Sequence, residues 1–132
     1  MFSLQQIHHA HDQVKTGADF PKYIHDLKNL GVLSFRFQVL DGIELYQGKD
    51  GFEQQTEPKY EALNLVQEVD LASFSKELID HQQGKTDFPH FIKICADTGV
   101  NYWIVDLVGL TCTYYDAYDE IILSEDILMD SI

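Results

Sequence analysis

The residues best suited to chemistry lie around one predicted turn between two helices. His81, Lys85 and Asp87 come close together there. A histidine beside a carboxylate can act as a general base because its unperturbed pKa is about 6.5. Cys112 and Tyr114 are spaced to share one face of a predicted strand. These five residues form the candidate ligand-binding or polar site, although a histidine at a helix end is more often a partner of the last helical carbonyls.

Two patterns resemble cofactor sites but are incomplete. The tripeptide Gly-Lys-Thr at 84–86 could end a phosphate-binding loop, but that loop needs a glycine at the position of Ile79 and a strand before it. His8, His9 and His11 crowd the first predicted helix, yet no second group of ligands follows at a diagnostic spacing. We therefore expect exposed histidines, no metal and no cofactor.

The two cysteines and one glutamate are further candidates. Cys95 and Cys112 form neither a metal-ligand spacing nor a disulfide framework. Cys112 has no base beside it in the sequence, so we expect a buried, inert thiol rather than a nucleophile. Glu44 is the one carboxylate that a hairpin register could turn inward, where it would be a functional candidate. The preferred interpretation of Glu44 is an exposed position at a sheet edge.

The charge of the chain is strongly negative and uneven. The net charge is −13, and all nine Lys and Arg lie at or before Lys93, whereas residues 94–132 contain eight acidic residues and no basic one. Such a surface repels nucleic-acid phosphates and anionic lipids. The simplest explanation of the negative charge is that it keeps the protein soluble. Binding of a basic partner and mimicry of nucleic acid are the alternative explanations. Without an apolar signal core or a membrane-spanning run, we expect a cytoplasmic protein that binds neither nucleic acid nor membrane directly.

The elements that position the candidate residues occur twice in the sequence. Landmarks recur at a fixed offset of 68 (87 minus 19): Asp19-Phe20-Pro21, Gly31-Val32 and Phe35 match Asp87-Phe88-Pro89, Gly99-Val100 and Trp103. We therefore predict an internally duplicated helix–helix–three-strand unit. Its two copies, about residues 3–66 and 71–125, form a single domain over residues 1–132.

Local patterns place the elements within each copy. Helices are predicted over 3–16, 19–30, 70–83 and 87–98. Strands are predicted over 33–39, 62–66, 102–108 and 120–123, and another follows a hairpin turn at 41–42. A two-residue turn there would point Glu44 toward the core, whereas a three-residue loop would instead turn Ile43 and Leu45 inward, and the sequence leaves both open. A turn at Gly109-Leu110 would add a strand with Cys112 and Tyr114 on its inner face. The fold class is α+β, with four helices packed on one side of a mainly antiparallel sheet, in one sheet or two.

The two copies differ on the outer face of their first strand. The first copy has Ser34, Arg36 and Gln38 there, and the second has Tyr102, Ile104 and Val108. An apolar outer face indicates that it is covered, either by the C-terminal segment or by a second subunit. The second set is therefore the candidate interface of a homodimer.

Several motifs carry a family resemblance. They are the segments 81–89, 99–106 and 111–116, with 17–21, 30–32 and 58–60 upstream. Together they resemble the YbcV-like family of small uncharacterised bacterial and prophage proteins. The resemblance covers nearly the whole chain. It implies no activity and no functional residues, because the family has no established function.

We expect a non-enzymatic cytoplasmic binding protein that associates with itself and with a protein partner. The alternative is a small enzyme or ligand-binding protein with a site around His81, Lys85 and Asp87. A pocket of about 300 Å³ with converging polar groups would favour that alternative. A second alternative is an acidic nucleic-acid mimic of prophage type, which needs the carboxylates after Lys93 at phosphate-like spacing.

Overall fold

The computed structural model describes residues 1–14 and 19–127, which form four α-helices and one six-stranded antiparallel sheet. In chain order the elements are α1 (Leu4–His11), α2 (Phe20–Leu30), β1 (Ser34–Gln38), β2 (Glu44–Gln47), a 3₁₀ turn η2 (Lys49–Gly51), β3 (Glu53–Gln55), α3 (Leu71–Gln82), α4 (Phe88–Asp97), β4 (Tyr102–Asp106), β5 (Thr111–Tyr115) and β6 (Ile121–Asp126). The predicted α+β class with four helices is confirmed, and the strands form one sheet in the order β3-β2-β1-β4-β5-β6. None of the described helices is long and apolar enough to cross a membrane.

Most helix ends lie where the sequence signals predict. The carboxylate of Asp87 accepts a hydrogen bond from the backbone N–H of His90 at 2.9 Å, and Pro89 occupies the first turn of α4, where its missing N–H costs nothing. Gly31 ends α2 at φ +98°, a conformation that glycine adopts without steric cost. Helix α1 ends at His11, earlier than predicted, and the predicted end near residue 16 lies outside the described residues.

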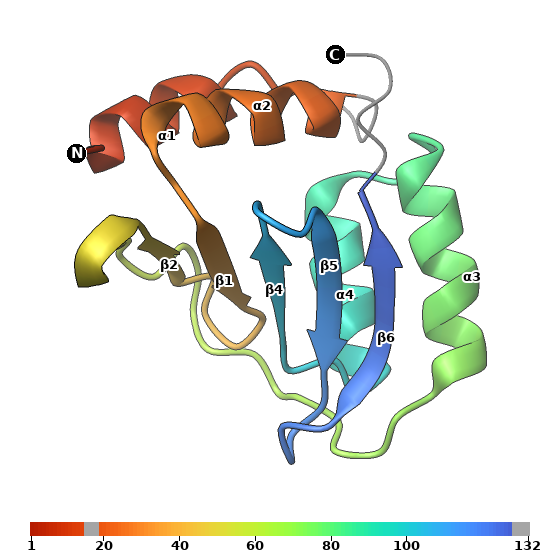
Figure 1. The fold of residues 1–132 in the computed structure, drawn as a ribbon. Helices are drawn as coiled ribbons and strands as arrows, with labels where there is room; N and C mark the ends of the chain where they lie inside the picture. The colour runs from red at the N-terminus through yellow and green to blue at the C-terminus, as the bar shows by residue number, and fades with distance from the viewer. Residues whose placement is uncertain (15–18, 128–132) are drawn as a thin grey trace.

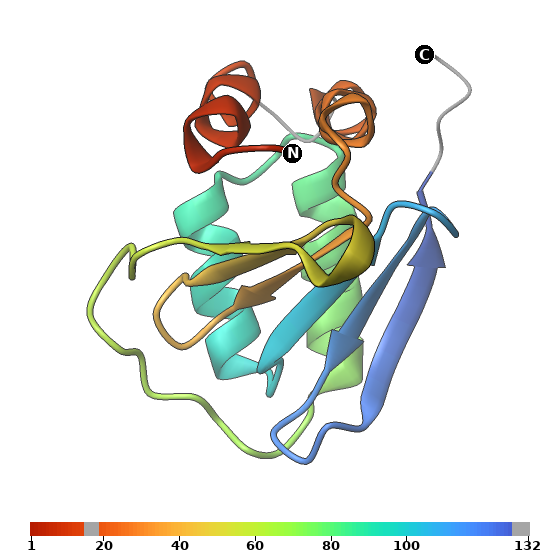
Figure 2. The same cartoon turned by 60° about the vertical axis from the view of Figure 1, so that its left-hand side comes forward.

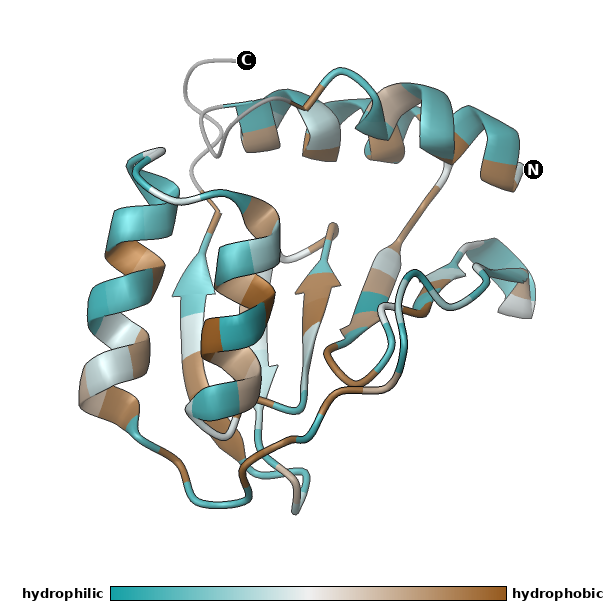
Figure 3. Ribbon diagram, turned by 180° about the vertical axis from the view of Figure 1, so that it is seen from behind, coloured by the Kyte–Doolittle hydropathy of each residue, from teal (hydrophilic) through white to brown (hydrophobic). Residues whose placement is uncertain are grey.

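The helices turn their apolar sides toward one face of the sheet. Helices α3 and α4 lie behind β4, β5 and β6, and α1 and α2 cross the upper end of the molecule (Figures 1 and 2). Seen from behind, the brown apolar residues of α1 and α2 lie on the lower side of these helices, which is turned toward the rest of the molecule (Figure 3). At the centre of the core the rings of Phe37 and Trp103 stack at 4.5 Å and 8°. Tyr23 of α2 packs on Phe35, and Phe74 of α3 packs on Tyr114.

The two central strands pair with a register that follows the offset of 68 residues. Phe35 lies opposite Val105 and Phe37 lies opposite Trp103. Adding 68 to 35 gives 103, and adding 68 to 37 gives 105. The offset therefore relates Phe35 to Trp103 and Phe37 to Val105, and it converts one of the two pairs into the other. The element order helix–helix–three strands also occurs twice. The internal duplication nevertheless stays a prediction, which a superposition of residues 3–66 on 71–125 would test.

Two predictions for the first half are wrong. The third strand is β3 rather than 62–66, because the turn η2 brings residues 53–55 back beside β2. Segment 62–66 instead bonds through single backbone contacts, such as Val66 N–H to Ala96 O at 2.9 Å. The hairpin turn is also wider than two residues, since β1 and β2 pair through Phe37 and Glu44.

In the second half, the turn at Gly109-Leu110 places Cys112 opposite Val105 and Tyr114 opposite Trp103, as predicted.

Candidate functional site

His81 is packed between α3 and α4 rather than exposed in a cleft. Its ring stacks on Phe91 with centroids 4.5 Å apart at 11°. Its Nδ1 lies 3.3 Å from the hydroxyl of Thr86, across the turn that Gly84 allows at φ +78°. Burial lowers the pKa of His81 below its ordinary value. The histidine is therefore mainly a neutral packing residue that joins the two helices.

Lys85 and Asp87 lie at the same turn but serve the helix ends. Lys85 Nζ is 3.8 Å from Asp80 Oδ1, and both groups are partly exposed to water. Asp87 caps α4 through the backbone N–H of His90. These contacts explain both residues structurally, because an N-cap carboxylate satisfies a backbone donor that the helix leaves free.

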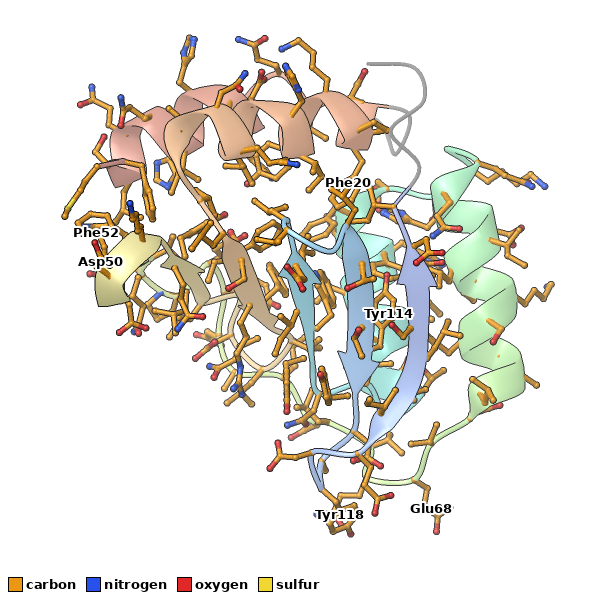
Figure 4. The ribbon with its side chains drawn as sticks, in the orientation of Figure 1. Phe20, Asp50, Phe52, Glu68, Tyr114 and Tyr118 are labelled. Carbon is orange, nitrogen blue, oxygen red and sulfur yellow. The ribbon has the colours of Figure 1, made fainter. Side chains whose placement is uncertain are left out.

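Cys112 and Tyr114 lie on the inner face of β5, away from the turn. Burial raises the pKa of the Cys112 thiol to about 12 and raises the pKa of Tyr114 well above its usual value. The ring of Tyr114, labelled in Figure 4, contacts Phe74 at 5.0 Å and Trp103 at 5.8 Å. A thiol that stays protonated at neutral pH is a poor nucleophile. The expectation of a buried, unreactive Cys112 agrees with this placement.

The five candidate residues thus form two groups rather than one constellation. Among the described residues, no hydrogen bond or ion pair joins Cys112 or Tyr114 to His81, Lys85 or Asp87. One hollow of about 380 Å³ lies between Leu33 and Phe52, and another of about 340 Å³ lies along α1 and α2. Neither hollow is lined by a candidate residue.

A buried polar network that sequence reasoning missed lies under β2. Glu44 is only 7% exposed, so the predicted exposed position is wrong. Its Oε1 is 2.7 Å from Lys59 Nζ, and its Oε2 accepts a 2.6 Å hydrogen bond from Tyr46. The hydroxyls of Tyr46 and Tyr23 lie 3.1 Å apart. The lysine comes from an irregular loop, and this explains why strand patterns alone did not reveal the pair.

The polar groups of this network are satisfied by one another and by the backbone. Lys59 Nζ also donates to Gly42 O at 2.7 Å and to the hydroxyl of Thr56 at 3.2 Å, so all its donors are used. Burial and the charge of Glu44 raise the pKa of Tyr46, which therefore stays protonated. Among residues 1–14 and 19–127, no three His, Cys, Asp or Glu side chains could together hold a metal ion. The network fastens the loop to the sheet.

The outer face of the sheet carries a second arrangement that only its tertiary pairing reveals. The guanidinium of Arg36 lies 3.8 Å above the ring of Tyr102, which stacks on Tyr115 at 4.7 Å and 11°. The hydroxyl of Tyr102 donates to Asp119 at 2.9 Å. Tyr102, predicted as an interface residue, is therefore only 6% exposed and is covered by its own chain. Ile104 is partly exposed and Val108, on the following turn, is 72% exposed.

Arg36 lacks an acidic partner despite the excess of carboxylates in the chain. Within the described part of the chain no carboxylate lies within ion-pair distance of its guanidinium. Its Nε is buried without a hydrogen-bond partner. Leu45 and Ile104 flank it on the neighbouring strands. An unpaired cation between apolar side chains is a candidate contact for a carboxylate from outside the chain.

A family model described as "Protein of unknown function (DUF1398)" matches residues 8–126. The match begins within α1 and includes α2, α3, α4 and the whole sheet, so it covers most of the fold described above. No curated protein matches the chain.

Proposed function

We propose a function from the geometry, because the chain belongs to the DUF1398 family, whose description names no activity. The protein acts by binding, and it associates with a second copy of itself through the outer face of its sheet. The observation that carries this proposal is the unpaired Arg36 at the centre of an uncovered face.

The outer face is open over most of its width. No helix lies in front of β4, β5 or β6 in Figure 1, where this face is turned toward the viewer. Two cross-strand rows run over the middle of it, Leu45–Arg36–Ile104–Thr113–Ser124 and Gln38–Tyr102–Tyr115–Ile121. Arg36 is the one charged side chain in these two rows. These two rows contain no carboxylate, whereas the next row holds Asp106 and Asp126, so the two rows are where two chains of net charge −13 repel each other least.

The same face also provides a complementary charge. Asp126 lies at the end of the next row, opposite Thr111, and its side chain is exposed. In a two-fold arrangement of two sheets, each copy can offer a carboxylate to the other's guanidinium. Contacts of this kind set register and orientation more than affinity.

The size of the face predicts a weak dimer. Six strands about 4.8 Å apart and about five residues long give a flat footprint of roughly 24 by 16 Å, or about 400 Å². A standard interface buries about 800 Å² on each partner. We therefore expect a concentration-dependent dimer rather than an obligate one.

Sedimentation equilibrium over about 5 to 500 μM tests the proposal, because that range spans micromolar dissociation constants. Ile104→Lys places a charge in the centre of the face and is expected to weaken dimerisation at least tenfold. Ile79→Lys makes the same change on an exposed position of α3 and should leave the dimer intact. A wild-type monomer over the whole range, or equal loss in both variants, refutes the proposal.

The enzyme alternative has less support. Its residues His81, Lys85 and Asp87 are engaged in packing, pairing and capping, and Cys112 with Tyr114 lies apart from them. A catalytic site needs a reactive group and a substrate position within reach of each other.

A further inference from the structure

Two short segments that both combine acidic with apolar residues meet at the end of the molecule that is far from α1 and α2. Residues 66–71 lead into α3, and residues 116–121 connect β5 to β6. Both lie at the lower end in Figures 1 and 2, and Figure 4 shows Glu68 and Tyr118 there, pointing outward. The hydroxyl of Tyr118 lies 3.5 Å from the amide oxygen of Gln67, which joins the two segments. We call this surface the acidic end.

The acidic end exposes large apolar side chains. Their exposed fractions range from 40% for Val69 to 67% for Tyr118. The set consists of Val66, Val69, Leu71, Tyr118 and Ile121. Single exposed apolar residues are ordinary, but a group of them rimmed by polar residues is typical of a protein-interaction surface.

Acidic residues alternate with these apolar residues along both segments, and neither segment contains a basic residue. The two segments contain five acidic residues and no Lys, Arg or His. Asp70 caps α3, Asp116 accepts two backbone N–H groups of its own turn, and Asp119 accepts the hydroxyl of Tyr102. Glu68 and Glu120 are exposed, and their carboxylates form no hydrogen bond or ion pair with another described residue. Their negative charge is available to a partner.

Hydrogen bonds and close backbone packing fix the conformation of both segments. In the 116–121 turn, Asp116 accepts from the N–H groups of Tyr118 and Glu120 at 2.8 and 3.0 Å, and its own N–H donates to Glu120 O at 3.0 Å. The 66–71 segment packs on Gly99, where an added Cβ would lie 2.6 Å from Glu68 O. A preformed surface loses little conformational entropy when a partner binds.

We infer that the acidic end docks a segment of a partner protein in which basic side chains flank apolar ones. The apolar residues of the partner cover Val69 and Tyr118, while its lysines or arginines meet Glu68 and Glu120. Nucleic acid and anionic lipid do not fit, because their phosphates are repelled by the same carboxylates. Of the residues of the acidic end, only Ile121 also lies in a row of the outer face. The residues that carry the inference, Val69, Tyr118, Glu68 and Glu120, lie outside those rows, so the inference does not depend on self-association.

The probe is a fluorescein-labelled amphipathic peptide made of Lys and Leu, and its isomer with Glu in place of Lys is the control ligand. Fluorescence anisotropy with the full-length protein is expected to show binding of the Lys peptide only. The double variant Val69→Ser/Tyr118→Ser should weaken that binding at least fivefold. Glu68→Gln/Glu120→Gln should weaken it at least threefold at low salt, and less at high salt, because the charge contribution is screened.

Matched variants outside the acidic end separate docking from general charge attraction. Ile79→Ser/Leu40→Ser removes two exposed apolar side chains elsewhere, and Glu57→Gln/Glu61→Gln removes two exposed carboxylates elsewhere. Both are expected to bind the Lys peptide within twofold of the wild type. Circular dichroism confirms that each variant is folded.

Three outcomes overturn the inference. They are no binding of the Lys peptide, equal weakening in test and control variants, or weakening by the charge variant alone. If only the charge variant weakened binding, the peptide would be attracted by net charge alone, and the apolar side chains would not form a docking surface. Sedimentation of the same variants shows whether the dimer is affected, so failure of the proposed self-association is read independently.

Discussion

Replacing Lys59 by methionine removes the counter-ion of a buried carboxylate while keeping the length of the side chain. The lysine ammonium has three acceptors: Glu44 Oε1 at 2.7 Å, Gly42 O at 2.7 Å and Thr56 Oγ1 at 3.2 Å. After the substitution, Glu44 keeps only the hydroxyl of Tyr46 as a side-chain partner. We expect the free energy of unfolding to fall, because a buried charge without its counter-ion is strongly unfavourable.

The magnitude follows from the contacts. A hydrogen bond to a charged group contributes about 1.5–3 kcal/mol and a lysine bond to a neutral acceptor somewhat less. The Lys59 side chain is 36% exposed, whereas that of Glu44 is 10% exposed. Water can therefore partly replace the lysine, which reduces the expected loss to about 2–3 kcal/mol. For a chain of this length that corresponds to a melting temperature lower by about 10 °C.

Urea unfolding followed by the fluorescence of Trp103, the single tryptophan of the chain, measures the change. Adding Glu44→Gln to Lys59→Met should recover about 1 kcal/mol, because the unpaired charge is then gone. Lys22→Met, which breaks an exposed pair with Asp26, should cost about 0.5 kcal/mol or less. A loss under about 1 kcal/mol in Lys59→Met, or a double variant less stable than Lys59→Met, would refute the reasoning.

Four further outcomes are expected. Gly99→Ala should lower the free energy of unfolding in urea by about 2 kcal/mol or more, because φ is +91° and the Cβ meets backbone. Gly84→Ala, at φ +78° with open space around it, should cost only about 1 kcal/mol. Cys95 and Cys112, whose thiol pKa values are raised by burial, should resist iodoacetamide at pH about 8 in the native protein and react when it is unfolded, as mass spectrometry can show. Since burial lowers the pKa of His81, its neutral form stabilises the fold above pH about 6.5, and this contribution is lost as the pH falls toward the folded-state pKa. His81→Phe should therefore unfold with a weaker dependence on pH than the wild type below about 6.5.

Local signals in the sequence predicted most of the fold, because they act over a few residues. Asp87 and Pro89 mark the start of α4, and Gly31 and Gly99 end helices at positive φ. The recurrence of aromatic residues at a constant offset indicated which strand face is buried, and the pairing of Phe37 with Trp103 follows it. These features need no knowledge of distant contacts.

The features that the sequence did not predict depend on contacts between distant segments. Strand β3 consists of Glu-Gln-Gln, which has little intrinsic preference for a strand and forms because β2 offers a free edge. Glu44 is buried because Lys59 reaches it from a loop without regular spacing. Tyr102 is covered because Arg36 comes from the neighbouring strand. The candidate site likewise combined His81 with Cys112, which the fold separates.

The distribution of reactive and accessible groups is the basis of the proposal that the protein acts by binding. In the core, Cys112 and Tyr46 are held protonated by burial, and Glu44 is neutralised by its lysine. On the surface, the titratable groups of the α3–α4 turn cap helices or form ion pairs. Within the described residues two features are open to a further partner. They are the guanidinium of Arg36, which contacts the Tyr102 ring but no carboxylate, and the apolar side chains of the acidic end. Unpaired cations and exposed apolar groups gain free energy by contact with another molecule, so these surfaces are where the function of the protein should be sought first.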